Sequence, residues 1–289
     1  MRYLKIFVII VTVLSFCTIP VYAKDPFENV TARAMILVEP DTDTVLYAKN
    51  EFKTEYPASI TKLMTALLAF ENDIDMDEII TVSETAYDKL SPDSSTANLI
   101  KGEQLSMYDL FACLLIPSAN EAANVIAEHV AGSIDEFVKM MNDKAQELGL
   151  KNTHFMNPHG LHEENHYTCA YDVYLIVKEI LQVKEIAEIC SMQNYTLAKT
   201  NKSPQRNLVT TNHLISKLRY KNYYYDSANG IKTGYTSAAG LCLVSSAERD
   251  GIKLISVVLG CQRDPITSEM NSFYESAALL DYGFEKLSE

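Results

Sequence analysis

The chain has 289 residues, of which 47% are hydrophobic, 22% charged and 9% aromatic. This is the composition of a globular protein with room for one large domain or two interleaved lobes. The formal net charge is −13 at pH 7. A chain this acidic does not hold a nucleic-acid backbone by general electrostatics, so nucleic acid is excluded as an expected partner.

The N-terminus has the pattern of a secretory signal peptide. Arg2 and Lys5 precede an apolar run over 6–19, and Pro20 leads into Val21-Tyr22-Ala23, with small residues at the positions that a signal peptidase reads. Because the apolar run is short for a membrane span, we expect residues 1–23 to be cleaved, with an uncleaved anchor as the alternative. Cleavage removes two basic residues and leaves 23 basic against 38 acidic side chains, a net charge of −15.

The next elements are a hairpin and a helix. Short apolar runs at 34–38 and 45–48 flank turn-forming residues and predict a β-hairpin. After Pro57, apolar residues recur at helical spacing. This spacing predicts a helix that begins near Ser59.

The middle of the chain is mostly helical in pattern. From 105 to 150 the apolar spacing predicts helices almost throughout. The expected starts and stops are Ser106, Ser118 and Ser133, and Gly132 and Gly149. Residues 151–168 are rich in Asn, His, Pro and Gly and predict an irregular loop, and a further helix is expected over 170–181.

The C-terminal part predicts strands again. Apolar runs at 228–232, 241–246 and 253–259 are strand-like, and 249–251 make a hairpin turn between the last two. An amphipathic helix over 268–282 closes the chain. Strands at both ends with helices between them predict an α+β fold, in which an antiparallel sheet is built from both termini and a helical lobe is inserted. A cleft between the two parts is the expected site.

Five cysteines follow the predicted signal peptide, and none forms a C-x-x-C pair. They are Cys113, Cys169, Cys190, Cys242 and Cys261. Their odd number and apolar surroundings predict buried free thiols, with one disulfide as the alternative.

Residues 162–166 spell H-E-x-x-H, the pattern of zinc peptidases. Two such histidines reach one metal only from one face of a helix. Here the motif follows the turn-forming residues 157–160 and contains Asn165. We therefore predict polar loop residues at this position and no metal site.

Ser59 and Lys62 form an S-x-x-K pattern at the start of a predicted helix. Residues i and i+3 share one face, so the amine of Lys62 reaches the hydroxyl of Ser59. Burial and a second cation would lower the pKa of this lysine and make it a base for the serine. Taken alone, the pattern equally fits a helix-capping serine followed by a surface lysine.

Two further motifs favour the catalytic interpretation. Ser118 and Asn120 form S-x-N at the expected start of a helix. Lys232, Thr233 and Gly234 form K-T-G at the end of a predicted strand, where Lys232 supplies the second cation and Gly234 allows close approach to a ligand. S-x-x-K, S-x-N and K-T-G in this order form the set found in penicillin-binding proteins and class A β-lactamases.

Together these motifs resemble those of the low-molecular-mass penicillin-binding proteins, the serine-type D-alanyl-D-alanine carboxypeptidases (peptidase S11 type). The segments 56–65, 152–161, 230–236 and 239–244 resemble that family, and the resemblance covers about residue 29 to 285. It implies a β-lactamase/transpeptidase-like fold with a five-stranded antiparallel sheet flanked by helices and an inserted helical lobe. It also places 162–166 in the variable tail of the family's loop.

The resemblance implies a role for each motif residue. Ser59 would attack the carbonyl between the two terminal D-alanines of a peptidoglycan stem peptide and become the acyl-enzyme, and Lys62 would take its proton. Ser118 would help relay a proton to the departing amine. Asn120 would bind the substrate's peptide and help to place Lys62.

The K-T-G strand would bind the rest of the substrate. Lys232, Thr233 and Thr236 would hold the terminal carboxylate, next to Gly234. The backbone N–H groups of Ser59 and Tyr235 would form the oxyanion hole. The resemblance implies no cofactor, and β-lactam antibiotics as covalent inhibitors.

Many relatives continue into a β-rich domain and a membrane-binding tail, whereas this chain stops soon after 280–284. We therefore expect residues 24–289 to be the catalytic domain, without a C-terminal β domain or membrane anchor, in a protein secreted to the cell-wall space. Two other functions remain open. A β-lactamase would need a glutamate-held water, and no convincing E-x-x-x-N segment is present in residues 121–190. A non-catalytic sensor of peptidoglycan or β-lactams would not need the complete motif set.

Overall fold

The structure, a computed structural model, describes residues 25–72 and 74–288. The chain divides into two compact units, Met1–Val30 and Thr31–Glu289, and the fold described below is that of the second unit. The predicted signal peptide lies outside the described residues. Within the described ranges, no helix is both long and apolar enough to cross a membrane.

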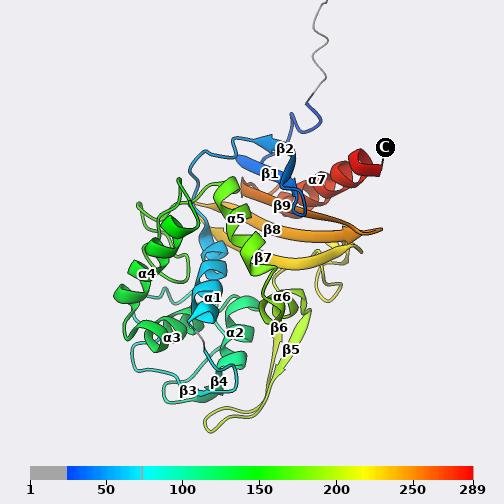
Figure 1. Ribbon diagram of the computed structural model, residues 1–289. Coiled ribbons are helices and arrows are strands. Elements are labelled where there is room, and N and C mark those ends of the chain that lie inside the picture. Colours follow the sequence, from blue (N-terminus) through cyan, green and yellow to red (C-terminus); the bar gives the residue numbers. More distant parts are fainter. Residues whose placement is uncertain (1–24, 73, 289) are drawn as a thin grey trace, which may run out of the picture. The chain divides into compact units, whose positions relative to one another are not determined.

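A five-stranded antiparallel sheet is the centre of the second unit (Figure 1). Its strands, in sheet order, are β2 (Thr44–Lys49), β1 (Ala34–Glu39), β9 (Ile252–Cys261), β8 (Gly240–Arg249) and β7 (Ala228–Thr236). The two N-terminal strands therefore pair with the three C-terminal ones through β1 and β9. This confirms the predicted α+β fold with a sheet built from both ends of the chain.

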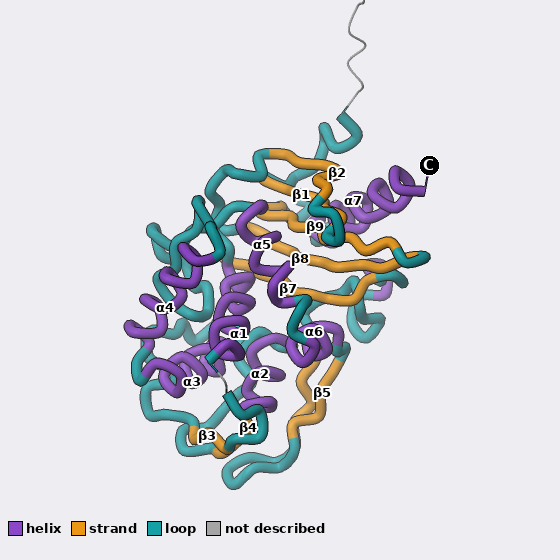
Figure 2. The backbone as a smooth tube through the Cα atoms, in the orientation of Figure 1, coloured by secondary structure: helices purple, strands orange, loops and turns teal. Residues whose placement is uncertain are grey.

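The segment between these strands forms the helical lobe. Its elements are η1 (Ala58–Thr61), α1 (Lys62–Glu71), β3 (Ile79–Thr81), β4 (Gln104–Ser106), α2 (Met107–Leu115), α3 (Asn120–Ala131), α4 (Ile134–Glu147), α5 (Ala170–Ile180), α6 (Lys184–Ser191), β5 (Asn194–Leu197), β6 (Arg206–Val209) and η2 (Lys221–Tyr223). Figure 2 shows the two small hairpins, β3–β4 and β5–β6, at the end of the lobe away from β1 and β2. The final helix, α7 (Asn271–Ser288), returns to the sheet.

Alternation along the buried strands separates two faces of the sheet. Ile36 and Val38 of β1 belong to the large core that α1 to α6 share. Leu37, between them, lies against Gly283 of α7. Ser256, paired with Leu37 in register, bonds to a serine of α7 as well. Because successive side chains of a strand point to opposite faces, α7 covers one face and the lobe the other.

Most predicted elements are confirmed, including the N-terminal hairpin and the turn between β8 and β9. Ser106 and Ser133 cap α2 and α4 through their hydroxyls, as predicted. Gly132 ends α3 in the left-handed conformation. The 151–168 region is an irregular loop, and the five described cysteines are free and buried.

Two predicted element boundaries were wrong: the start of the helix at S-x-N and the end of the strand at K-T-G. Ser118 does not start α3, because its φ of +69° is left-handed and the helix begins at Asn120 after Ala119. K-T-G does not end a strand, because β7 continues through Thr236 and pairs with β8 from Gly230 to Thr236, with Gly234 opposite Cys242.

Other features were missed or shifted. The two small hairpins were not predicted, because strands of three or four half-exposed residues carry little periodic signal. The helix α6 was also not predicted. The last helix begins at Asn271 and ends at Ser288, rather than spanning 268–282. The helix expected near Ser59 begins with a 3-10 turn.

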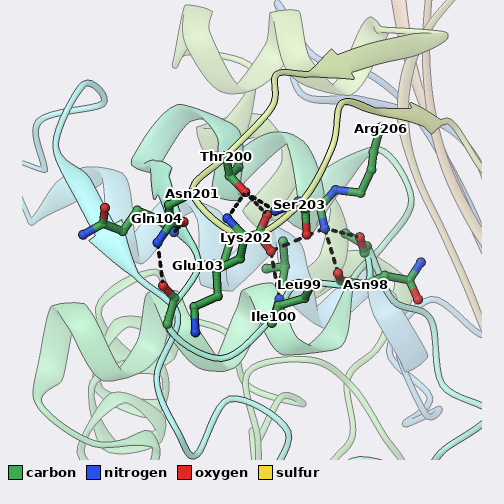
Figure 3. Close-up of polar contacts among 12 residues, drawn as sticks. Asn98, Leu99, Ile100, Glu103, Gln104, Thr200, Asn201, Lys202, Ser203 and Arg206 are labelled. Carbon is green, nitrogen blue, oxygen red and sulfur yellow. Dashed lines mark hydrogen bonds and ion pairs between the residues drawn. The ribbon is translucent and has the colours of Figure 1, made fainter.

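A buried carboxylate fixes the loop between β3 and β4 (Figure 3). The Glu103 side chain is fully buried, and its Oε1 accepts from Arg206 Nη2 at 2.5 Å and from Thr200 Oγ1 at 2.6 Å. Its Oε2 accepts from the Ile100 N–H at 2.8 Å. Arg206 also donates to the Asn98 carbonyl at 2.7 Å. The loop is thereby tied to the β5–β6 hairpin.

We expect Arg206→Met to lower the free energy of unfolding by about 3–5 kcal/mol, because it leaves the Glu103 carboxylate buried without its charged partner. Urea denaturation measures this loss. The matched control is the double variant Glu103→Leu/Arg206→Met, which leaves no unpaired charge and loses less stability than the single variant. A single variant as stable as the native protein would contradict this account.

Candidate functional site

Ser59 lies in the 3-10 turn that leads into α1. The preceding Ala58 has a φ of +48°, a left-handed conformation that is costly for a residue with a Cβ. One turn later, Lys62 Nζ lies 3.0 Å from Ser59 Oγ. The S-x-x-K spacing therefore brings the two groups together as predicted.

Lys62 is fully buried, and no carboxylate forms an ion pair with it among the described residues. Its Nζ donates to Asn120 Oδ1 at 2.6 Å and to the His159 carbonyl at 2.7 Å. A neutral amine has two N–H groups and one lone pair. In its neutral form, Lys62 donates its two N–H groups to these two oxygens and directs its lone pair at the Ser59 hydroxyl.

The electrostatics favour this neutral form. Burial lowers the pKa of Lys62 well below its ordinary value, the nearby Lys232 lowers it further, and Glu121 partly opposes both. Burial also lowers the pKa of Lys232, to about 7. Burial is the larger cause of the lowered pKa of Lys62, and repulsion from the Lys232 ammonium adds to it, so both favour the neutral amine.

Lys232 connects the sheet to the start of α3. Its buried Nζ donates to Ser118 Oγ at 2.8 Å and to the Thr233 carbonyl at 3.1 Å. The left-handed backbone of Ser118 sets this residue apart from the helix that follows. Three motifs that are distant in sequence therefore meet through hydrogen bonds.

The K-T-G strand runs directly beside the Ser59 turn. A Cβ on Gly234 would lie 3.0 Å from Ser59 N and 3.0 Å from the Pro57 carbonyl oxygen, so glycine permits this approach. Thr233 is half-buried, and its hydroxyl lies 2.5 Å from that of Thr211. Sequence reasoning did not identify Thr211, which belongs to no motif.

These residues line a cavity of about 540 Å³. Seven of the nine predicted site residues line it: Ser59, Ser118, Asn120, Thr233, Gly234, Tyr235 and Thr236. Lys62 and Lys232 do not line the cavity, but each is hydrogen-bonded to a serine that does, Ser59 and Ser118 respectively. Tyr235 is 58% exposed at the mouth of the cavity.

Other lining residues were not predicted. The loop between β3 and β4 contributes Ser91, Asp93, Ser94 and Ser95. Two exposed arginines, Arg219 and Arg263, and the buried His213 lie on the same cavity. Each comes from an irregular segment whose position depends on tertiary packing, so no spacing in the sequence indicates them.

The 151–168 loop packs against the turn that contains Ser59. His166 Nδ1 accepts from the Met156 N–H, so Nε2 carries the proton that is donated to Thr61 Oγ1 at 2.8 Å. Burial lowers the pKa of His166 to about 3, which keeps this ring neutral. A Cβ on Gly160 would lie only 1.9 Å from the Ala58 carbonyl oxygen.

The H-E-x-x-H segment is a loop, as predicted, and its two histidines contact different residues. His162 packs edge-on against Tyr56, with ring centroids 4.6 Å apart, whereas His166 faces Thr61. Within the described ranges, no three His, Cys, Asp or Glu side chains form a group that could hold a metal ion.

Comparisons with known proteins found a matching family. The family model of D-alanyl-D-alanine carboxypeptidases, Peptidase_S11, matches residues 20–263. The chain is 38% identical over 260 residues to the D-alanyl-D-alanine carboxypeptidase DacF of Bacillus subtilis, covering 88% of this chain and 62% of that protein. It is 33% identical to DacA of Haemophilus influenzae, covering 89% of this chain and again 62% of the relative. The chain thus spans about three fifths of the length of these relatives.

Solved structures share the fold. The Streptomyces K15 DD-transpeptidase superposes with a TM-score of 0.80 at 27% identity, covering 89% of this chain and 98% of that one. Penicillin-binding protein 5 from Haemophilus influenzae gives a TM-score of 0.77 at 33% identity, covering 89% and 71%. The β-lactamase/transpeptidase-like fold expected from the sequence is confirmed.

We expect Gly160→Ala to disrupt the support of the Ser59 turn. Its φ of +88° costs alanine about 1–2 kcal/mol, and the clash with the Ala58 carbonyl adds about 1–3 kcal/mol. The matched control is Gly149→Ala, where φ is +70° but no atom lies within 4 Å of the new Cβ, so only the conformational cost remains. Thermal unfolding of both variants measures the difference. Equal losses would show that the close contact has no energetic role.

Proposed function

The chain belongs to the D-alanyl-D-alanine carboxypeptidase family, peptidase S11, and we propose that it removes the terminal D-alanine from peptidoglycan stem peptides through an acyl-enzyme on Ser59. The observation that carries this proposal is the buried Lys62 amine, whose Nζ lies 3.0 Å from Ser59 Oγ and also contacts Asn120 Oδ1 and the His159 carbonyl. Because this substrate lies in the cell wall, we place the activity outside the cytoplasm.

In the acylation step, Ser59 Oγ attacks the carbonyl carbon of the bond between the two D-alanines, and its proton passes to Lys62 Nζ. The N–H groups of Ser59 and Tyr235 stabilise the oxyanion, a contribution of about 3 kcal/mol in such sites. As the C–N bond breaks, a proton reaches the departing amine through Ser118. Water then hydrolyses the ester and regenerates the serine hydroxyl.

Substrate binding is assigned to the strand beside the nucleophile. Thr233, Thr236 and the ammonium of Lys232 hold the terminal carboxylate, and Asn120 binds the substrate's peptide group. Arg219 and Arg263 add positive charge to the same cavity, which supports recognition of a carboxylate by an otherwise acidic protein.

A β-lactamase is the second candidate, and one observation disfavours it. The only carboxylate side chain among the described residues that line the cavity is Asp93, and it is exposed. No glutamate is available there to hold a deacylating water. We therefore expect β-lactams to acylate Ser59 and to leave slowly.

The test is release of free D-alanine from a stem pentapeptide. We expect turnover by the native chain, and a loss of about a thousandfold or more in Ser59→Ala, because the nucleophile is absent. Penicillin treatment followed by intact-mass measurement and peptide mapping gives a long-lived adduct on Ser59.

Ser94→Ala is the control, since it changes a cavity-lining hydroxyl without a proposed role and retains turnover. An adduct with no D-alanine release would favour the sensor interpretation. Repeated rapid hydrolysis of penicillin would favour the β-lactamase.

The pKa directions predict a bell-shaped pH dependence of kcat/KM. The rate falls at low pH as Lys62 gains a proton and ceases to be a base. It also falls above about pH 7, as Lys232 loses the proton that holds the carboxylate. In Lys232→Arg the guanidinium stays charged, so we expect the alkaline limb to move up by several pH units. An unchanged alkaline limb in this variant would exclude Lys232 as its origin.

A further inference from the structure

A second cavity, of about 570 Å³, adjoins the catalytic one. Three separate stretches of the chain contribute to both. Ser237 lines the catalytic cavity and Ala238 lines the second. Likewise, Ser59 lines the catalytic cavity and Tyr56 lines the second. In the 151–168 loop, Leu161 lines the first and Glu164 the second. Because Ser237 and Ala238 are consecutive, and the other pairs are three residues apart, the two cavities lie close together along the chain.

The proposed function fixes the direction of the substrate along β7. Its terminal carboxylate lies at Lys232 and Thr233, and the reacting carbonyl lies where Gly234 meets Ser59. The rest of the peptide therefore leaves past Thr236 and the segment that follows it. That path leads to the second cavity.

The second cavity is strongly charged. Arg33, Lys53 and Lys151 line it together with Glu55 and Glu164. Glu55 is buried and already paired, with Arg33 Nε at 2.6 Å and Lys53 Nζ at 3.0 Å. Arg33 is further fixed by donating to the Ala239 carbonyl at 2.8 Å.

Two opposite charges remain available to a ligand. Lys151 and Glu164 are both exposed, and neither forms an ion pair with any described residue. An unpaired ammonium and an unpaired carboxylate on one cavity are complementary to a group that carries both charges. A free amino-acid terminus is such a group.

We infer that the second cavity binds the residue preceding the two D-alanines when that residue is a diamino dicarboxylic acid, whose side chain ends in an ammonium and a carboxylate on one carbon. Lys151 pairs with this carboxylate and Glu164 with this ammonium. The inference rests on the proposed function, from which the direction of the substrate is taken. It also gives Glu164, in the middle of the H-E-x-x-H segment, a role in recognition.

The test compares two stem pentapeptides that differ only at the third residue. One carries the diamino dicarboxylic acid and the other carries lysine, whose side chain ends in an ammonium alone. Because an exposed ion pair contributes up to about 1 kcal/mol, we expect kcat/KM for D-alanine release to favour the first peptide by about fivefold.

Variants separate the two charges. Lys151→Met removes the preference by lowering kcat/KM for the first peptide alone, and Glu164→Gln lowers kcat/KM for both peptides. Lys199→Met is the matched control, because Lys199 is exposed and lines neither cavity. N-acetyl-D-alanyl-D-alanine, which lacks the third residue, is expected to react equally with all variants.

Calorimetric binding of both pentapeptides to Ser59→Ala makes the subsite testable without turnover. The same preference, lost on adding Lys151→Met, supports the inference. Equal binding of the two peptides, or a preference that survives Lys151→Met, overturns it. Absence of D-alanine release by the native chain, with the binding preference intact, overturns the proposed function and leaves the subsite standing.

Discussion

A buried amine without a counter-ion is the constraint on which the rest of the site depends. Charging Lys62 in this interior is costly, because it is buried beside neutral oxygens and another amine, and the Glu121 carboxylate opposes this cost only in part. The fold provides those neighbours from three places: α3, the 151–168 loop and β7. Each supplies one part of an environment that favours the neutral amine.

The 151–168 loop contributes lining residues to both cavities. It gives the His159 carbonyl to Lys62, supports the Ser59 turn through His166 and Gly160, and places Glu164 on the second cavity. Its conformation is irregular, yet much of its backbone is held by buried side chains. A single irregular loop thus contacts the Ser59 turn and also lines the second cavity.

Sequence reasoning identified the side chains of the site better than their surroundings. Ser59 and Lys62 were predictable because helical geometry relates positions i and i+3, and Lys232 because a strand motif follows a regular pattern. The His159 carbonyl was not, since every residue has a carbonyl and only tertiary packing selects one. Ser118 was mistaken for a helix cap because a serine before a helical pattern usually caps it, whereas here its backbone is left-handed and its hydroxyl meets Lys232.

β7 is the outermost strand of the sheet, and an open strand edge ordinarily invites pairing with foreign chains. Here α6 closes one end of that edge, where Gly230 meets the Cys190 carbonyl, and the Ser59 turn closes it near Gly234. Only residues 231–233 lie between these two contacts, and the side chains of Ile231 and Lys232 are buried. So short a stretch of edge offers few backbone groups to a second chain, which disfavours self-association through it.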